Sequence, residues 1–283
     1  MGAGRSGSTI LGVALGNCAG IFYAGELDKW LLMSGVSMAE RDQDANPRPE
    51  EGTGMWREIR EEIADAGPLF GRDTRRCIEH SSALFRVDKW SERKSLRGSY
   101  RRLTGALYGS IALHTGASHI VDSSHFPLRA RELQEMTDVD LHLIYLVRDP
   151  RSVVASWGRR GLPEPSFPML TTNAYLWLTH LLSVLVFLRQ PRDRRLFVRY
   201  EGLVADPARV VGEILEMSGS EAALPDFAAL STGTPYHGNR LILSPTVSLN
   251  PTASAPPPAS LVTSILQLPW RVVFSRLRPA AGG

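Results

Sequence analysis

The sequence predicts an α/β fold of three layers, in which helices cover both faces of a central, mostly parallel sheet. Two observations predict it. Short apolar runs typical of β-strands recur at 119–122, 141–147 and 196–200. The first two are each followed at once by a polar turn and a helical pattern, at 127–136 and 150–159, and strands that alternate with helices form parallel sheets. Ligands of such sheets bind beyond the carboxyl ends of the strands, so we expect functional residues just after each strand.

Other segments have the apolar periodicity of helices. The first, 8–15, directly follows a glycine-rich opening, and longer ones lie at 55–66 and at the Arg- and Lys-rich 91–115. A stretch rich in Pro, Gly and acidic residues at 42–54 predicts a surface loop. The apolar run 174–188 is shorter than the roughly 20 residues that a membrane span needs and contains polar side chains. It predicts a buried helix and no membrane span.

Composition and charge indicate an ordinary globular protein. The 283 residues suffice for one α/β domain with a single core, or for two small ones. Hydrophobic residues at 43% and charged residues at 22% are typical of folded chains. The net charge of +3 is too small to indicate nucleic-acid binding, but it is compatible with a local basic pocket for an anionic ligand.

The two cysteines, Cys18 and Cys77, lie far apart and lack CxxC or Cys/His ligand spacing. We therefore expect neither a disulfide framework nor a metal site. Ordinary thiols and a start without the pattern of a signal peptide predict a cytoplasmic protein. We expect one domain over 1–249, a Pro/Ser/Ala linker at 250–260 and a C-terminal amphipathic segment at 261–283, which Pro269 interrupts.

The opening sequence, GAGRSGST at 2–9, has the outline of a phosphate-binding loop. Its glycines let backbone N–H groups converge on an anion, and the following helix points its positive end at the same place. A nucleotide-triphosphatase loop reads GxxxxGK[ST]. Here Ser8 stands where that lysine belongs, and the basic residue, Arg5, lies inside the loop. No acidic strand end suited to Mg²⁺ follows, so phosphoryl transfer lacks its key parts.

This loop, followed by Ile-Leu, resembles the 5′-phosphosulfate loop of sulfotransferases that use 3′-phosphoadenosine-5′-phosphosulfate (PAPS). The closest resemblance is to the bacterial, Golgi carbohydrate and tyrosylprotein branches, which place Arg where the cytosolic branch has Lys. The resemblance implies a sulfotransferase fold related to that of P-loop NTPases, and a bacterial origin. It also implies that Arg5 offsets charge on the bridging oxygen as the S–O bond breaks. The residues it assigns to the phosphosulfate are Gly4, Arg5, Ser6, Gly7, Ser8 and Thr9.

A second motif follows the strand predicted at 141–147. The strand ends at Arg148, Pro150 opens a helix at a position that tolerates proline, and Ser156 lies about two turns along that helix. An arginine and a serine so placed converge on one phosphate. The pair resembles the 3′-phosphate motif of the same family, an Arg followed by a Ser eight positions later. By the same resemblance, Arg240 belongs to a basic loop that closes over the 3′-phosphate.

Two residues are candidates for the group that takes the acceptor's proton. Glu26 lies 21 positions past Arg5, and a glutamate at a similar distance is the proposed base in tyrosylprotein and some mycobacterial sulfotransferases. His125 follows the strand at 119–122 and precedes Phe-Pro, the setting of the base in cytosolic members. Bacterial relatives usually have Lys in its place. We predict Glu26 as the base and His125 as its active-site partner. The alternatives for His125 are that it is itself the base or a weaker positive substitute for that Lys.

The sequence thus predicts a sulfotransferase that moves a sulfuryl group from PAPS to a hydroxyl of a small-molecule, glycan or lipid acceptor and releases 3′-phosphoadenosine-5′-phosphate (PAP). Two alternatives remain. One is a P-loop kinase or other nucleotide-binding protein. The other is a catalytically degenerate scaffold that binds a protein partner through the basic stretch 93–102 and the Pro-rich tail. The acceptor and the oligomeric state are open at this point.

A loop of this type is normally preceded by a buried apolar strand in the centre of the sheet. Only Met1 stands before Gly2. We therefore expect the first strand to be truncated in this chain, by an upstream start or by a shortened form, with loss of its ladder hydrogen bonds and packing.

Overall fold

The computed structural model describes residues 1–32, 50–64, 72–158, 169–249 and 261–277. Within them the strands are β1 (Ile21–Gly25), β2 (His119–Asp122), β3 (Leu143–Val147), β4 (Arg195–Arg199), β5 (Leu230–Ser231) and β6 (Thr246–Val247). β1 pairs with β2 and β3 with β4, both in parallel, whereas the short β5 and β6 are antiparallel. The predicted parallel sheet is confirmed. β1 was missing from the sequence prediction.

The principal helices follow the predicted order. They are α1 (Ser8–Gly16), α3 (Glu50–Ala64), α4 (Arg72–Glu79), α5 (Trp90–Thr115), α6 (Pro127–Leu133), α7 (Pro150–Gly158), α8 (Met169–Arg189), α9 (Tyr200–Ala205), α10 (Pro207–Ser218), α11 (Leu261–Leu266) and α12 (Leu268–Arg276). The loop predicted at 42–54 is wrong for its last five residues, which begin α3, because α3 packs against α5 through an apolar face. Its first eight lie outside the described residues.

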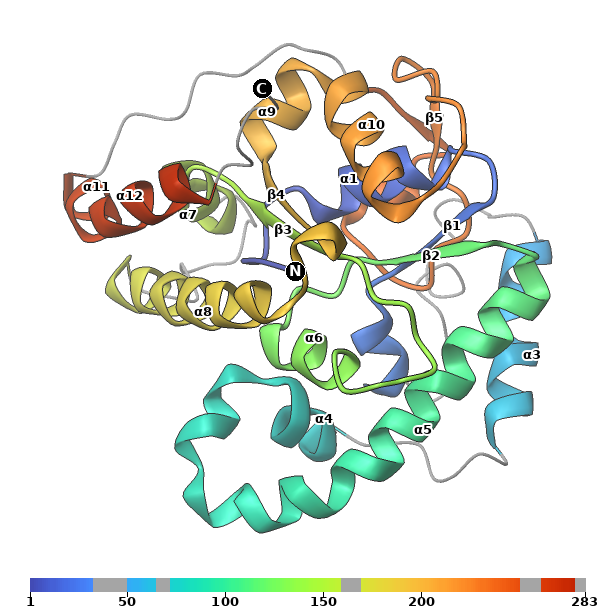
Figure 1. The fold of residues 1–283 in the computed structure, drawn as a ribbon, viewed down its shortest axis with the longest axis horizontal. Helices are drawn as coiled ribbons and strands as arrows, with labels where there is room; N and C mark the ends of the chain where they lie inside the picture. The colour runs from blue at the N-terminus through green and yellow to red at the C-terminus, as the bar shows by residue number, and fades with distance from the viewer. Residues whose placement is uncertain (33–49, 65–71, 159–168, 250–260, 278–283) are drawn as a thin grey trace.

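The strands lie between two layers of helices, with α1, α9 and α10 on one side and α5, α6 and α8 on the other (Figure 1). Successive residues of β3 are buried in cores on opposite faces of the sheet. Leu146 belongs to the core shared with α1 and α10. Leu143, Tyr145 and Val147 belong to a second core with α6, α8 and α12. Side chains of a strand alternate between faces, so a strand buried on both sides confirms the three-layer architecture.

Proline and polar caps fix where several helices begin. Proline occupies the first turn of α6, α10 and α12, where its missing N–H is not needed. Asp206 caps α10, because its Oδ1 accepts a hydrogen bond of 3.1 Å from the backbone N–H of Arg209. Pro269 thus separates α11 from α12, as the sequence predicted.

A cavity of about 640 Å³ interrupts the sheet between β2 and β3. Met1 lies at one end of it, with Leu15 of α1 and Ile214 of α10 on one side and Tyr108 of α5 on the other. Among the described residues β2 and β3 do not pair with each other, and Gly2 forms an isolated bridge to Leu146 of β3. The sheet is therefore divided at the place where the sequence predicts a truncated central strand.

Met1 continues β3's ladder at the edge of this cavity. Its ammonium group donates a hydrogen bond of 2.7 Å to the carbonyl of Ile144. The Leu146 N–H donates in turn to the carbonyl of Met1 at 3.0 Å. Burial lowers the pKa of this amino group to about 6, because the protein interior disfavours the charged form.

Helix α8 is buried on one face only, so the prediction of a buried helix is half confirmed. Thr179, His180 and Ser183 are buried. Leu181 and Leu185 are about half exposed, at 47% and 54%. By length and composition its segment 170–189 could cross a membrane, but 44% of its most apolar window is buried within the protein. A single such helix is weak evidence for a span.

The C-terminal helices pack on the domain. Trp270 and Phe274 of α12 lie in the core with Tyr145 and Phe197, and the Trp177 indole N–H donates to the carbonyl of Leu266 at 2.8 Å. Residues 250–260 and 278–283 lie outside the described residues, so the linker and the extent of the domain stay predictions.

Candidate functional site

The opening loop has a backbone that only glycine fits at position 7. Gly7 precedes α1 with φ of 98°, and a Cβ there would lie 2.3 Å from Cδ2 of Tyr200. Arg5 also has a positive φ, of 73°, which is uncommon outside glycine. The loop therefore turns sharply into α1, as a phosphate-binding loop does.

The concave side of this loop fits an anion. No side chain caps the N-terminus of α1, whose helix dipole places partial positive charge there. The hydroxyl of Ser6 is buried, with the residue 2% exposed, and has no hydrogen-bond partner among the described residues. A buried hydroxyl without a partner costs about 1–3 kcal/mol, and a phosphate or sulfate oxygen would supply one. The loop residues thus fit the anionic end of a donor such as PAPS.

Arg148 joins the second predicted motif to this loop. It follows β3 directly, and its Nη1 donates a hydrogen bond of 3.4 Å to the carbonyl of Arg5. Its guanidinium lies over the ring of Tyr200, 4.2 Å from the centroid, and this stacking orients the side chain. The two segments, predicted separately from sequence, meet in the structure.

Helix α7 packs on the same loop. Val153 forms a small buried cluster with Ala3 and Leu176. Ser156 lies one turn farther along α7 and is half-buried. Ser156 therefore lies on the helix that begins two residues after Arg148.

The segment 237–240 reaches the loop from the far end of the chain. The Asn239 N–H donates to the hydroxyl of Thr9 at 3.4 Å, and Tyr236 N–H donates to the carbonyl of Ala24 at 3.0 Å. Arg240 is exposed and opens a short 3-10 helix, Arg240–Leu243. The loop that carries Arg240 thus lies beside α1 and the end of β1.

Glu26 follows β1 and faces His237. Its backbone N–H donates to the His237 carbonyl at 2.8 Å, and its Oε2 lies 3.2 Å from Nδ1 of His237. Burial raises the pKa of this carboxyl, but the contact with His237 and the nearby charges of His125 and Lys29 outweigh burial and leave the pKa below its ordinary value. Glu26 is therefore ionised at neutral pH. The role of His237 was missed by the sequence prediction.

Tyr23 links the opening loop to the residues that follow β1 and β2. Its hydroxyl lies 3.1 Å from Oγ of Ser123, and it also interacts with Thr9 and with the charge of Glu26. Burial raises the pKa of Tyr23 to about 12, so the phenol keeps its proton. Sequence reasoning missed Tyr23, although Gly12 and Gly16 signal it. A Cβ on either would lie within 2.7 Å of Tyr23, so these glycines let β1 approach α1.

His125 lies between two hollows. One, of about 50 Å³, is lined by Ser6 and Ser8 of the loop and by Ser123. The other, of about 270 Å³, lies against α8. The His125 ring stacks on Phe126 with centroids 4.6 Å apart, and its charge acts on Glu26. The structure therefore brings the two predicted catalytic residues together beside the loop.

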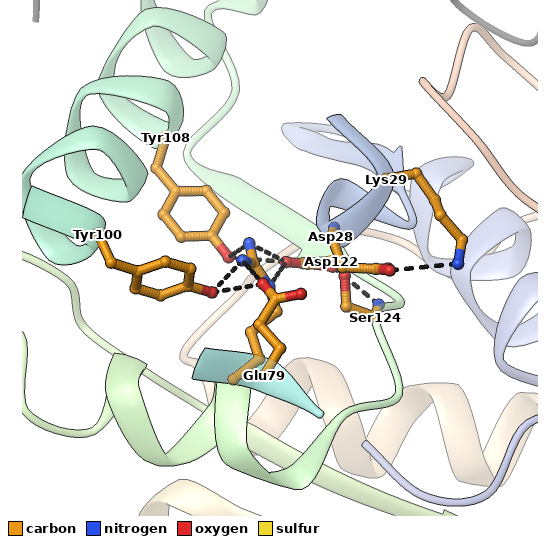
Figure 2. A network of polar contacts seen from close by, with 8 residues as sticks. Asp28, Lys29, Glu79, Tyr100, Tyr108, Asp122 and Ser124 are labelled. Atoms are coloured by element: carbon orange, nitrogen blue, oxygen red, sulfur yellow. Dashed lines mark hydrogen bonds and ion pairs between the residues drawn. The ribbon is translucent and has the colours of Figure 1, made fainter. Parts of the chain in front are cut away.

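A buried ionic network holds the turn that carries His125 (Figure 2). Arg129, 1% exposed, reaches Asp122 through Nη2 at 2.9 Å and Glu79 through Nη1 at 3.0 Å. Tyr100 donates to Glu79 at 2.6 Å, and Tyr108 donates to Asp122 at 2.8 Å.

Asp122 connects this network to the turn after β2 through hydrogen bonds. Its Oδ1 accepts from the backbone N–H of Ser124 at 2.8 Å, and the Ser124 hydroxyl accepts from the N–H of Asp28 at 3.0 Å. The turn after β2 is thereby tied to the segment after β1. Because the network joins residues of α4, α5, α6 and β2, no local sequence pattern predicts it.

Within the described residues, no group of three or more His, Cys, Asp or Glu side chains is placed to hold a metal ion. The site is instead made of loop N–H groups, hydroxyls, arginine, histidine and one carboxylate.

Comparisons with known proteins show the family and the fold of the chain. Residues 1–223 match a family model described as "Sulfotransferase family". The fold is similar to the sulfotransferase domain from the Synechococcus PCC 7002 olefin synthase, with a TM-score of 0.53 and 18% identity over 95% of this chain and 92% of that one. It is also similar to the sulfotransferase domain from the curacin biosynthetic pathway, with a TM-score of 0.54 and 17% identity over 95% of each chain. None of the curated proteins matches. Since the family model covers most of the sequence, the chain belongs to the sulfotransferase family.

Proposed function

We propose that this protein transfers a sulfuryl group from PAPS to an acceptor hydroxyl and releases PAP. The observation that carries the proposal is the hydrogen bond from Arg148 to the carbonyl of Arg5. It joins the two segments whose sequences resemble the 5′-phosphosulfate and 3′-phosphate motifs. The membership in the sulfotransferase family supports the same chemistry.

The roles proposed for the binding residues come from the family resemblance, and their positions in the structure support them. Gly4 to Thr9 would hold the phosphosulfate at the positive end of α1, with the buried Ser6 hydroxyl as one donor. Arg148, with Ser156 on α7 and Arg240 on the loop beside Thr9, would bind the 3′-phosphate. Arginine suits this task because its planar fork donates two parallel hydrogen bonds to a phosphate.

In the transfer, the acceptor oxygen bonds to sulfur while the bond from sulfur to the bridging phosphate oxygen breaks. The electron pair of that bond leaves with PAP. Arg5 would stabilise the charge that develops on the bridging oxygen, and the acceptor's proton passes to a base. In-line placement of the acceptor supplies the rest of the acceleration.

Glu26 is our candidate for that base. It is ionised at neutral pH and close enough to His125 to interact with its charge. The lowered pKa makes it a weaker base than an ordinary carboxylate, so His125 is its competitor. Glu26→Gln should reduce kcat by about 10²–10⁴-fold and leave PAP affinity intact, while His125→Gln in the same assay measures the share of the imidazole. A fully active Glu26→Gln enzyme would exclude Glu26 as the base.

The function is tested by PAP release from PAPS against a panel of phenols, alcohols, glycolipids and sugars. We expect turnover with at least one hydroxyl acceptor in the presence of EDTA, because in the proposed transfer Arg5 stabilises the charge of the leaving group. Turnover of ATP with Mg²⁺, but not of PAPS, would indicate a P-loop kinase. A chain that binds neither nucleotide would indicate the degenerate scaffold.

A further inference from the structure

The larger hollow beside His125 has apolar walls. It measures about 270 Å³ and lies between the turn after β2, which supplies Phe126 and Pro127, and α8, which supplies Tyr175 and Leu178. Its volume is just below the roughly 300–1,000 Å³ of drug-sized ligand pockets. It therefore suits a small ring or a short alkyl chain.

Charge is missing from these walls. Of the described residues that line the hollow, His80 and His125 are the two that can acquire a charge near neutral pH, and no Asp, Glu, Lys or Arg is among them. A carboxylate or sulfate brought into such a site loses its hydration and finds no Arg or Lys partner among these residues. The walls thus select against charged groups.

Two side chains connect the hollow with the donor loop. His125 lines both this hollow and the smaller one formed by Ser6 and Ser8. Tyr175 interacts with the backbone of Gly4, within the loop. A molecule whose apolar part fills the hollow can therefore direct a hydroxyl past His125 toward the loop.

Three arginines of the basic stretch at 93–102 converge on one buried carboxylate. Arg97 and Arg101 both lie 2.9 Å from carboxylate oxygens of Glu132, and Arg93 lies 3.8 Å away. Glu132 is 1% exposed. These arginines thus compensate a buried carboxylate of α6, in a stretch that the sequence analysis considered as a partner surface.

We propose that the acceptor is an uncharged alcohol or phenol whose apolar group binds in the hollow between α8 and Phe126. This inference rests on the proposed sulfotransferase function and adds the substrate class. The hydroxyl lies at the His125 end, and the apolar group contacts Phe126, Tyr175 and Leu178.

The first test compares acceptors that differ in charge. 4-Methylphenol and 4-hydroxybenzoate have similar shapes, and 1-hexanol and glucose extend the series to alkyl and strongly polar alcohols. We expect kcat/KM for 4-methylphenol to exceed that for 4-hydroxybenzoate by at least about 100-fold, because the carboxylate would be desolvated without a partner. Equal or reversed preference, or a preference for glucose over 1-hexanol, would overturn the inference.

The second test fills the hollow. Ala174 lines it from an exposed position of α8, so Ala174→Phe adds bulk at the rim without disturbing the core. We expect KM for the best apolar acceptor to rise at least about tenfold, since excluding one or two carbon groups of a substrate from an apolar pocket weakens binding by about this factor. Leu185→Phe, on the same helix but beyond the hollow, is the control and should leave KM unchanged.

PAP binding separates this inference from the proposed function. Ala174→Phe and wild type should show the same thermal shift with PAP, which also reports folding. If wild type does not bind PAP, the proposed function fails. If it binds PAP and KM is unchanged in Ala174→Phe, only the acceptor assignment fails. If no panel member is turned over, binding of 4-fluorophenol to the PAP complex is measured by ¹⁹F NMR. Binding to wild type that is lost in Ala174→Phe would support the acceptor assignment. Absence of binding to wild type, or equal binding to both, would overturn it.

Discussion

Arg148 is the side chain that joins the two phosphate-binding segments. It contacts the Arg5 carbonyl and stacks on Tyr200. Arg148→Ala should weaken PAP binding about 10–100-fold, because hydrogen bonds to charged groups contribute about 1.5–3 kcal/mol. Isothermal titration with PAP measures the change directly.

Two further variants give this test its controls. Arg148→Lys keeps the charge but loses the two-pronged donor, so its affinity should be intermediate. Arg192→Ala removes an exposed arginine that precedes the amino end of β4, whereas Arg148 follows the carboxyl end of β3. This variant should leave the affinity for PAP unchanged. An unaltered Kd in Arg148→Ala would show that this side chain does not hold the nucleotide.

His237 should control the titration of Glu26. Burial alone would raise the pKa of this carboxyl, and the contact with His237 is the largest effect that lowers it. Because the folded pKa is depressed, the pair stabilises the fold above the usual pKa of a glutamate, and that stability is lost as pH falls through the folded value. In His237→Asn the pKa of Glu26 should rise.

The acid limb of the kcat/KM profile is the measurement for this prediction. It should move to higher pH in His237→Asn if Glu26 is the base. A limb that stays in place, with normal folding, would mean either that another group is the base or that His237 does not set its pKa. Glu26→Gln separates the two cases, since it removes the limb only if Glu26 causes it.

At this scale the sequence identified residues by motif and missed those that act through tertiary contacts. The loop and Arg148 were recognisable because their neighbours in the chain supply the geometry. His237, Tyr23 and Arg129 gain their roles from partners at least seven residues away. No local pattern marks such partners.

Arg129 makes α6 dependent on the elements around it. The side chain is paired with Glu79 of α4 and Asp122 of β2, both with little or no exposure. Arg129→Met should lower the free energy of unfolding by about 3–5 kcal/mol, since two buried carboxylates then lack their cation. Urea unfolding followed by circular dichroism measures the loss.

Arg131→Met is the matched control on the same helix. Its partner, Glu135, is exposed, and exposed pairs contribute only about 0–1 kcal/mol. The double variant Arg129→Met/Glu79→Gln should regain part of the loss, because it removes one of the stranded charges. Equal effects at Arg129 and Arg131 would contradict the assigned role of the network.

The cavity between β2 and β3 should accept one extended strand. Met1 already bonds to Ile144 and Leu146 in strand register, so five apolar residues placed before it would continue along β3 and meet β2. They would supply the ladder hydrogen bonds, bury apolar side chains and remove the buried charge. We expect Tm to rise by at least about 5 °C, given about 2–4 °C per kcal/mol for a domain of this size.

An extension of five Gly and Ser residues is the control and should change Tm little. The buried amino group adds a second readout. Its pKa of about 6 lies below the usual 8.0, so the unfolded chain binds more protons between these values and stability should rise with pH there. The apolar extension should remove this rise. No gain in Tm over the polar extension would refute the strand.

Elements with strong local periodicity were predicted well, and those fixed by partners were not. The helix predicted at 91–115 is α5 (Trp90–Thr115) to within one residue. β1 was missed because its five residues, IFYAG, alternate weakly and depend on pairing with β2. α8 is apolar on its exposed face as well, so hydropathy alone overstated its burial.

At the scale of the molecule, parallel strands bring distant residues to one edge. β1 is followed by Glu26, β2 by the turn of His125 and β3 by Arg148, with the opening loop beside all three. Because the carboxyl ends of parallel strands share an edge, the sequence could place His125 and Arg148 at one edge, whereas the place of Glu26 depends on β1, which was missed. The apolar hollow against α8 could not be foreseen, since it depends on how α8 lies across the turn after β2.

The most direct test of the whole account is the thermal shift of the protein with PAP in EDTA, compared with the shift given by ATP and Mg²⁺. A ligand at 100 times its Kd stabilises the folded state by about 2.7 kcal/mol. We predict a rise in Tm with PAP that Arg148→Ala reduces to about half or less, and little or no rise with ATP and Mg²⁺. A shift with ATP and Mg²⁺ alone, or none with either nucleotide, would contradict the assignment of this loop as a sulfuryl-donor site.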